Sequence, residues 1–138
     1  MSFVLDASAA LAWVFERADA TEAREAVAVL DRLATDEAIV PELWHLEVLN
    51  ALVVGCRRKA IATIEAVDFL DRLDALPIRT HGAPLADRKE QLFGLAREHD
   101  LSAYDAAYLD LAIRTQSPLA TFDRRLAAAR DRTGLGPP

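Results

Sequence analysis

The sequence has a single cysteine, Cys56, among its 138 residues. One cysteine excludes both an intramolecular disulfide and a cysteine-based zinc site. The chain also has no uninterrupted apolar stretch near the roughly 18 residues of a membrane span, and no basic region precedes its first apolar run. These absences predict a cytoplasmic protein that makes no contact with a membrane.

Positive charge is scarce, since 16 Lys and Arg residues stand against 22 Asp and Glu residues and the net charge is −6. A broadly cationic surface is therefore excluded, and any contact with nucleic acid has to use local patches or metal ions. Most short basic clusters in proteins are only solvated helix faces. The clusters present are Arg57-Arg58-Lys59, Arg88-Lys89, Arg124-Arg125, and Arg130 with Arg132.

Several catalytic motifs are missing. No Gly-x-Ser-x-Gly and no Gly-rich phosphate loop occur. A hydrolase of the haloacid dehalogenase type needs a second Asp where this chain has Ser8, and a receiver domain needs a Lys at a late strand end, whereas the only lysines are Lys59 and Lys89. Both classes are disfavoured. The histidines, which show no metal-ligand spacing, are His45, His81 and His99.

Apolar residues are plentiful, at 52% of the chain, and their pattern predicts an α/β fold. A chain of this length fits one domain over residues 1–138, which typically buries about 68–70% of its unfolded surface. Short apolar runs alternate with helical patterns, and this order predicts a parallel sheet covered by helices on both faces, an α/β/α sandwich. The expected strands are 3–5, 38–40, 78–80 and 119–121.

The helical segments differ in how much of their surface is apolar. In the helix opened by Asp19 and Glu22, a stripe of Ala23, Val27, Leu30 and Ala34 is expected to face the core. The helix over 41–59 is apolar nearly all round, so it is expected to be buried. The remaining helices are expected at 9–15, 63–74, 85–99, 102–115 and 123–130, and residues 132–138 contain too little apolar material for more than a short fifth strand.

Four acidic residues occupy positions from which they can meet. Asp6 and Asp123 follow strands, and Asp105 lies in the first turn of a helix, so these three converge at the edge of the sheet where parallel strands end. Glu47 lies within the apolar helix and has to be paired, protonated, metal-bound or directed into a polar cleft. Asp110 lies about 140° round its helix from Asp105, so it is expected to be solvated and outside the cluster.

Each acid also has a purely structural interpretation. Asp6 and Asp123 can be helix N-caps, although Ser8 is the better cap of the first helix. Asp105 completes a Ser-x-x-Asp capping box. Glu47 can pair with an arginine or hydrogen bond to Asn50, which lies three residues further along the helix.

Convergent carboxylates repel one another, so such a cluster is unfavourable without a cation. Hard oxygen ligands suit Mg²⁺, with Mn²⁺ as a substitute, and either ion can bridge a phosphate oxygen. The chemistry that follows is phosphodiester hydrolysis, in which metal-activated water attacks and metal stabilises the leaving oxygen.

Four motifs that together span nearly the whole chain contain these acids: Val4-Leu5-Asp6-Ala7-Ser8-Ala9-Ala10-Leu11, Glu42-Leu43-Trp44-His45-Leu46-Glu47-Val48-Leu49-Asn50-Ala51-Leu52, Leu101-Ser102-Ala103-Tyr104-Asp105-Ala106-Ala107-Tyr108 and Leu119-Ala120-Thr121-Phe122-Asp123-Arg124-Arg125-Leu126. In sequence and order they resemble the acidic motifs of PIN-domain ribonucleases, and within that family most closely those of the VapC toxins of bacterial toxin–antitoxin pairs. The resemblance implies that Asp6, Glu47, Asp105 and Asp123 are the catalytic, metal-binding acids.

By the same resemblance, Ser8, Asn50 and Thr121 are supporting polar residues and the sheet order is 3-2-1-4-5. The family also implies an RNA substrate, a homodimer and a VapB-like antitoxin partner whose C-terminal segment covers the site. DNA is then contacted only through the antitoxin. The alternative is a catalytically silent protein of the same fold that acts only by binding its antitoxin. Nothing in the sequence reads a base, so the RNA is not identified.

Overall fold

The structure, a computed structural model, describes all residues 1–138. Strands and helices alternate along the chain in the order expected from the apolar pattern. The strands are β1 (Ser2–Leu5), β2 (Glu37–Val40), β3 (Ile78–Thr80) and β4 (Leu119–Ala120); the helices are α1 (Ala7–Leu11), α2 (Ala20–Arg32), α3 (Leu43–Arg57), α4 (Thr63–Asp74), α5 (Lys89–His99), α6 (Ala103–Thr115) and α7 (Arg124–Arg132), with a 3-10 helix, η1 (Leu85–Arg88), before α5.

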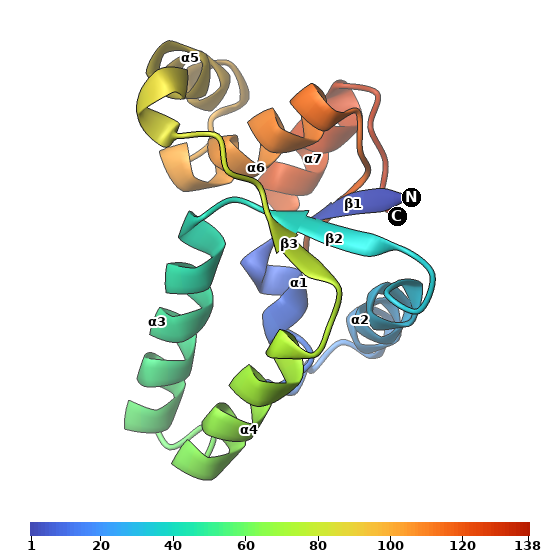
Figure 1. Cartoon of the computed structure of the whole chain (residues 1–138), viewed down its shortest axis with the longest axis vertical. Helices are drawn as coiled ribbons and strands as arrows, with labels where there is room; N and C mark the ends of the chain where they lie inside the picture. The colour runs from blue at the N-terminus through green and yellow to red at the C-terminus, as the bar shows by residue number, and fades with distance from the viewer.

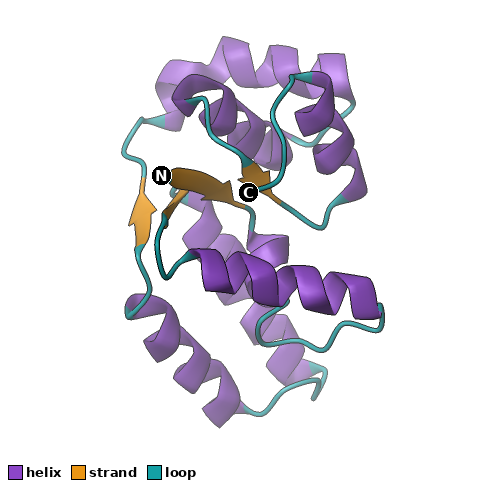
Figure 2. Cartoon of the chain, turned by 90° about the vertical axis from the view of Figure 1, so that its right-hand side faces the viewer, coloured by secondary structure: helices purple, strands orange, loops and turns teal.

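The four strands form one parallel sheet in the order β3-β2-β1-β4. Helices α1 to α4 lie on one side of the sheet and α5 to α7 on the other, as Figure 1 and the turned view in Figure 2 show. The predicted α/β/α sandwich is therefore confirmed. None of the helices has the length and apolar character that crossing a membrane requires.

The sheet stops at β4, so its order is 3-2-1-4 and the fifth strand, which was expected to be short or absent, does not form. The chain after α7 still reaches the outer edge of β4, where the Leu119 N–H donates to the Gly136 carbonyl at 3.0 Å. The Leu119 carbonyl accepts from Nη1 of Arg130, also at 3.0 Å. A side chain and one backbone group thus occupy the place of a fifth strand, while Leu135 packs against the core.

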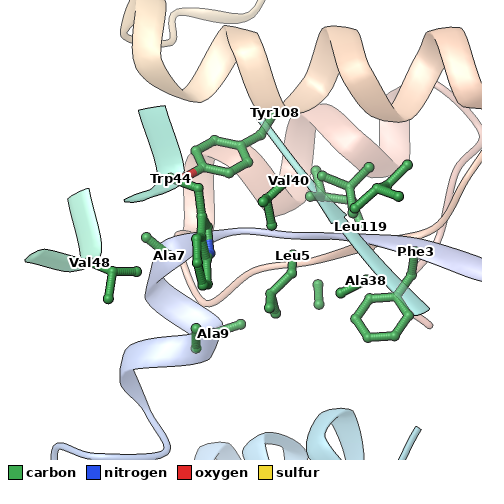
Figure 3. Close-up of a cluster of buried hydrophobic side chains, with 14 of the residues drawn as sticks. Phe3, Leu5, Ala7, Ala9, Ala38, Val40, Trp44, Val48, Tyr108 and Leu119 are labelled. Carbon is green, nitrogen blue, oxygen red and sulfur yellow. The ribbon is translucent and has the colours of Figure 1, made fainter. Parts of the chain in front are cut away.

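Strand β1 lies at the centre of the core. Side chains alternate between the two faces of a strand, so Phe3 and Leu5 point toward the α1 layer, whereas Leu119 and Tyr108 lie on the α6 side (Figure 3). All four are fully buried. Burial of a side chain of this size stabilises the fold by roughly 1.5–3 kcal/mol, so β1 is a rigid base for the residue that follows it.

Helix α3 is less buried than its composition predicts. Only a stripe spaced four residues apart, Trp44, Val48 and Leu52, packs into the core. Leu46 is 71% exposed and Leu49 is 42% exposed. The expectation of a buried helix is wrong because α3 lies at the outside of its layer, where part of its apolar surface faces solvent (Figure 1).

Helix α2 is rotated relative to the expected stripe. Asp19 caps it as predicted, accepting from the Thr21 and Glu22 N–H groups. The buried residue is Ala26, however, and Val27, which was expected to face the core, is 57% exposed. The indole N–H of Trp13 donates to the Ala26 carbonyl at 2.8 Å, so contact with the segment before α2 fixes the inward face.

Candidate functional site

The four predicted acids come together at the edge where the parallel strands end, here called the carboxyl edge. Asp6 follows β1, Asp123 is the N-cap of α7 after β4, and Asp105 lies in the first turn of α6. Glu47 reaches them from α3. Their carboxylates are close enough for their negative charges to repel one another.

Asp6 is buried and held by two hydroxyl groups. Ser8 Oγ donates to Asp6 Oδ2 at 2.6 Å, and Thr121 Oγ1 donates to the same oxygen at 2.7 Å. Asp6 stands at the N-cap position of α1, but its side chain makes no capping bond, and Ser8 lies inside the helix. The prediction that Ser8 caps the first helix is therefore wrong, because its hydroxyl turns to Asp6 instead.

The two hydroxyls also tie the ends of β1 and β4 together. Ser8 Oγ accepts from the Phe122 N–H, and Thr121 Oγ1 accepts from the Asp123 N–H, both at 3.0 Å. Each hydroxyl therefore accepts from one backbone group and donates to Asp6. The segment from Thr121 to Asp123 is held beside Asp6 by these bonds.

Glu47 has a partner that the sequence did not reveal. The hydroxyl of Tyr108, a fully buried residue of α6, donates to Glu47 Oε1 at 2.5 Å. In the sequence, Tyr108 resembles an ordinary core residue of an apolar helix, and the only signal was its position three residues after Asp105. Asn50 is exposed and bonds none of these acids, so its supporting role remains a prediction.

The capping role of Asp123 is also observed, whereas only the Ser102 half of the capping box at Asp105 forms. Ser102 Oγ accepts from the Asp105 N–H at 3.1 Å, and Asp123 Oδ1 accepts from the Leu126 N–H at 2.9 Å. The capping bond uses one carboxylate oxygen of Asp123. In the same way, the Tyr108 hydroxyl bonds one oxygen of Glu47, and the Ser8 and Thr121 hydroxyls bond one oxygen of Asp6. Each of these three carboxylates keeps a second oxygen without a protein hydrogen bond.

Burial and mutual repulsion raise the pKa values of Asp6, Glu47 and Asp105. Burial is the larger cause for Asp6, and the charges of Glu47 and Asp123 add to it, so its pKa rises to about 6 despite the two hydroxyl bonds. Burial and the charges of Asp6 and Asp123 raise the pKa of Asp105 to about 6 as well. Burial and the charge of Asp105 raise the pKa of Glu47, while the hydrogen bond from Tyr108 opposes the rise. No basic side chain compensates the group.

The carboxylate oxygens suit a hard divalent cation, but the four acids do not form a preformed metal site. No group of three or more His, Cys, Asp or Glu side chains is arranged to hold a metal ion. Mg²⁺ keeps several of its waters and is usually bound through only one or two carboxylates together with substrate phosphates. Four mutually repelling carboxylates with free oxygens satisfy that weaker requirement.

Asp110 corrects a further expectation. It is only 4% exposed, although it was expected to be solvated. Arg88 donates to it through Nε at 3.1 Å and Nη2 at 2.5 Å, and Arg114 donates through Nε at 3.0 Å. The expectation that Asp110 lies outside the cluster of four acids is confirmed. Its burial was missed because Arg88 lies 22 residues away in a different element.

The parallel sheet in the order 3-2-1-4, with helices on both faces, defines an α/β/α sandwich, and a family model assigns this fold to a family. The PIN domain matches residues 3–131, so the chain belongs to the PIN-domain family. It is 34% identical over 131 residues to Ribonuclease VapC3 of Pyrobaculum aerophilum, covering 92% of this chain and 93% of that protein. This relative places the chain among VapC-like members of the family.

The fold also matches a solved structure. The crystal structure of PAE2754 from Pyrobaculum aerophilum superposes with a TM-score of 0.67, covering 94% of this chain and 87% of that one. The two sequences are 23% identical. This similarity supports the fold.

Proposed function

We propose that the protein is a metal-dependent endoribonuclease and the toxin of a toxin–antitoxin pair. The observation that carries the proposal is Asp6, a buried carboxylate with no basic partner, surrounded by three further acids. A fold gains nothing in stability from such a group, since convergent carboxylates repel. A site of this kind is expected where a cation and a phosphate are to be bound.

The residues have distinct roles in this proposal. Bound Mg²⁺ or Mn²⁺ supplies activation of water and stabilisation of charge on the phosphate. Ser8 and Thr121 fix Asp6 through Oδ2, so its Oδ1 is the oxygen left for binding. Tyr108 fixes Glu47 through Oε1 in the same way. The free oxygens of these acids, with those of Asp105 and Asp123, are proposed as the direct or water-mediated ligands.

The proposed partners are an RNA strand, a VapB-like antitoxin and a second copy of the chain. The relative's name, Ribonuclease VapC3, supports the RNA substrate and the antitoxin. Exposed apolar side chains on α3 and α4 support a protein partner, because large side chains such as Leu46 and Ile64 are 71% and 79% exposed. DNA is proposed to be contacted only through the antitoxin.

A cleavage assay on a mixed pool of single-stranded RNA tests the proposal. Cleavage is expected with Mg²⁺, to stop with EDTA, and to fall at least about 100-fold in Asp6→Asn, because loss of even an outer metal contact costs about 10–100-fold. Asp31→Asn, which removes an exposed acid of α2, is the matched control and should cleave normally. Antitoxin binding without any metal-dependent cleavage would instead support a silent binding protein.

A further inference from the structure

A cavity that none of the four acids lines also opens at the carboxyl edge, on the side of β2 and β3. It has a volume of about 310 Å³ and is formed where β2 and β3 end, against α6. Helix α6 therefore contributes to both places, with Asp105 in the acidic site and Asp110 at the cavity. The polar residues that line the cavity are Glu42, His81, Arg88, Asp110 and Arg114.

The two arginines have donors to spare. A guanidinium carries five N–H groups. Asp110 takes two N–H bonds from Arg88 and one from Arg114, and no other protein acceptor bonds either guanidinium. Both side chains are about a quarter exposed, at 26% for Arg88 and 27% for Arg114. Asp110 thus fixes the arginines in place while most of their N–H groups remain free for a ligand.

The other charged groups do not cancel this arrangement. Glu42 is exposed, and solvent screens its charge. His81 lines the cavity and its Nδ1 is buried without a hydrogen-bond partner. Burial, and then the positive charges of Arg114 and Arg79, lower the pKa of His81, so the cationic field reaches this wall. With the charge of Glu42 screened, two arginines stand against the single buried carboxylate of Asp110, and this excess of positive charge favours an anion.

We propose that this cavity binds a backbone phosphate of the RNA strand, away from the phosphate that is cleaved. Fixed guanidinium groups bind phosphate oxygens through paired N–H bonds. A second phosphate held here, along the same sheet edge, places the strand across the four acids. Arg88 and Arg114 are positioning residues in this scheme, which rests on the proposed ribonuclease function.

The test measures binding of a labelled single-stranded oligoribonucleotide by fluorescence anisotropy in EDTA, where no cleavage is expected. Arg88→Gln should weaken binding roughly 5- to 10-fold, since it removes charge-assisted bonds. It should also reduce the slope of log K against log salt by about 0.7, the value for one phosphate contact in a single strand. Arg58→Gln, at the far end of α3, is the matched control and should change neither quantity as much.

A variant expected to tighten RNA binding separates an effect on binding from structural damage. Asp110→Asn removes a negative charge and leaves only one acceptor oxygen, so it frees N–H donors of the arginines and should tighten RNA binding by more than the charge-matched Asp31→Asn does. If the triad serves only the fold, neither Asp110→Asn nor Arg88→Gln should differ from its control, or both should weaken binding. Either result overturns the proposal.

A double variant covers the case in which Arg88→Gln fails to fold. Arg88→Gln with Asp110→Asn leaves no acid buried without its partner, and it should bind RNA more weakly than Asp110→Asn alone. Equal binding by the two would overturn the proposal. Weakened antitoxin or inorganic phosphate binding with unchanged RNA binding would also overturn it, by assigning the cavity to another ligand.

The same proteins assayed with Mg²⁺ keep the two proposals apart. Cleavage by the wild type together with control-like binding by the variants removes the phosphate site and leaves the ribonuclease proposal standing. Shifts in RNA binding without any cleavage support the phosphate site as an RNA contact and remove the nuclease.

Discussion

Asp6 and Asp110 are buried to the same extent, each 4% exposed, yet their surroundings are opposite. Asp110 is matched by two arginines, which form three N–H bonds to it. Asp6 receives only two hydroxyl bonds, and its charged neighbours are other acids. Burial alone therefore does not mark a functional acid in this protein. The presence or absence of a compensating cation distinguishes the two.

The comparison predicts opposite changes in stability, and this is the largest effect expected. In EDTA at pH 7, Asp6→Asn should raise the free energy of unfolding by about 3 kcal/mol, because the rise of the Asp6 pKa from 3.8 to about 6 has that equivalent. Asp110→Asn should lower it by about 2 kcal/mol. That is less than the roughly 3–5 kcal/mol for breaking a fully buried pair, because both arginines are partly exposed.

Urea unfolding of both variants beside the wild type measures these changes. Asparagine keeps an oxygen that can accept the Ser8 and Thr121 hydroxyl bonds, so Asp6→Asn loses the charge with little change in shape. A lower stability for Asp6→Asn in EDTA would show that its charge is compensated in some other way, and the contrast with Asp110 would disappear.

The second prediction concerns pH. A raised pKa means that the folded protein holds a proton on Asp6 at pH values where the unfolded chain, with a pKa of about 3.9, has lost it. Metal-free stability should therefore be highest near pH 4 and should fall as the pH rises through about 6, with Asp6 and Asp105 titrating together. Thermal melts across this range in EDTA check the sign.

Magnesium sharpens the same measurement. A cation that binds only the folded state should restore stability at neutral pH. The restoration should be smaller in Asp6→Asn, whose own fall with pH should also be shallower. Stability that rises from pH 4 to pH 7 without metal would contradict the repulsion described here.

The smallest expected effect concerns Tyr108. Tyr108→Phe removes the hydroxyl that fixes Glu47, so Mg²⁺ affinity measured by calorimetry should fall about 10-fold, at the low end for an outer contact of a metal site. Stability should change by about 1 kcal/mol, the usual value of one hydrogen bond. Tyr104→Phe, an exposed tyrosine on the same helix, is the control. If Tyr108→Phe leaves the Mg²⁺ affinity unchanged, Tyr108 contributes to the core and not to metal binding.

Much of the architecture follows from local patterns in the sequence. The four strands, the limits of α4 and the caps at Asp19 and Asp123 are all set within a few residues of chain. The convergence of Asp6, Asp105 and Asp123 also follows, because topology places strand ends and helix starts at one edge. What periodicity leaves open is which of two adjacent stripes on α2 faces inward; in the structure it is the stripe of Ala26, whose carbonyl accepts from Trp13.

The rest depends on pairs of residues far apart in the sequence. Asp110 was assigned to solvent because its partner Arg88 belongs to another element. Tyr108 and Glu47 are 61 residues apart, and neither position alone indicates their bond. The hydroxyl of Thr121 meets Asp6 across 115 residues. Side-chain contacts of this kind are formed only when the layers pack, so local patterns do not contain them.

The closed outer edge of β4 limits how copies of the chain can associate. An unpaired strand edge can recruit a strand from another molecule and start aggregation. Here the outward N–H and carbonyl of Leu119 are already bonded, to Gly136 and to Arg130. A short strand of two residues leaves little further backbone to pair. Assembly by strand addition is thus blocked at β4, and two copies that meet on this side do so through side chains.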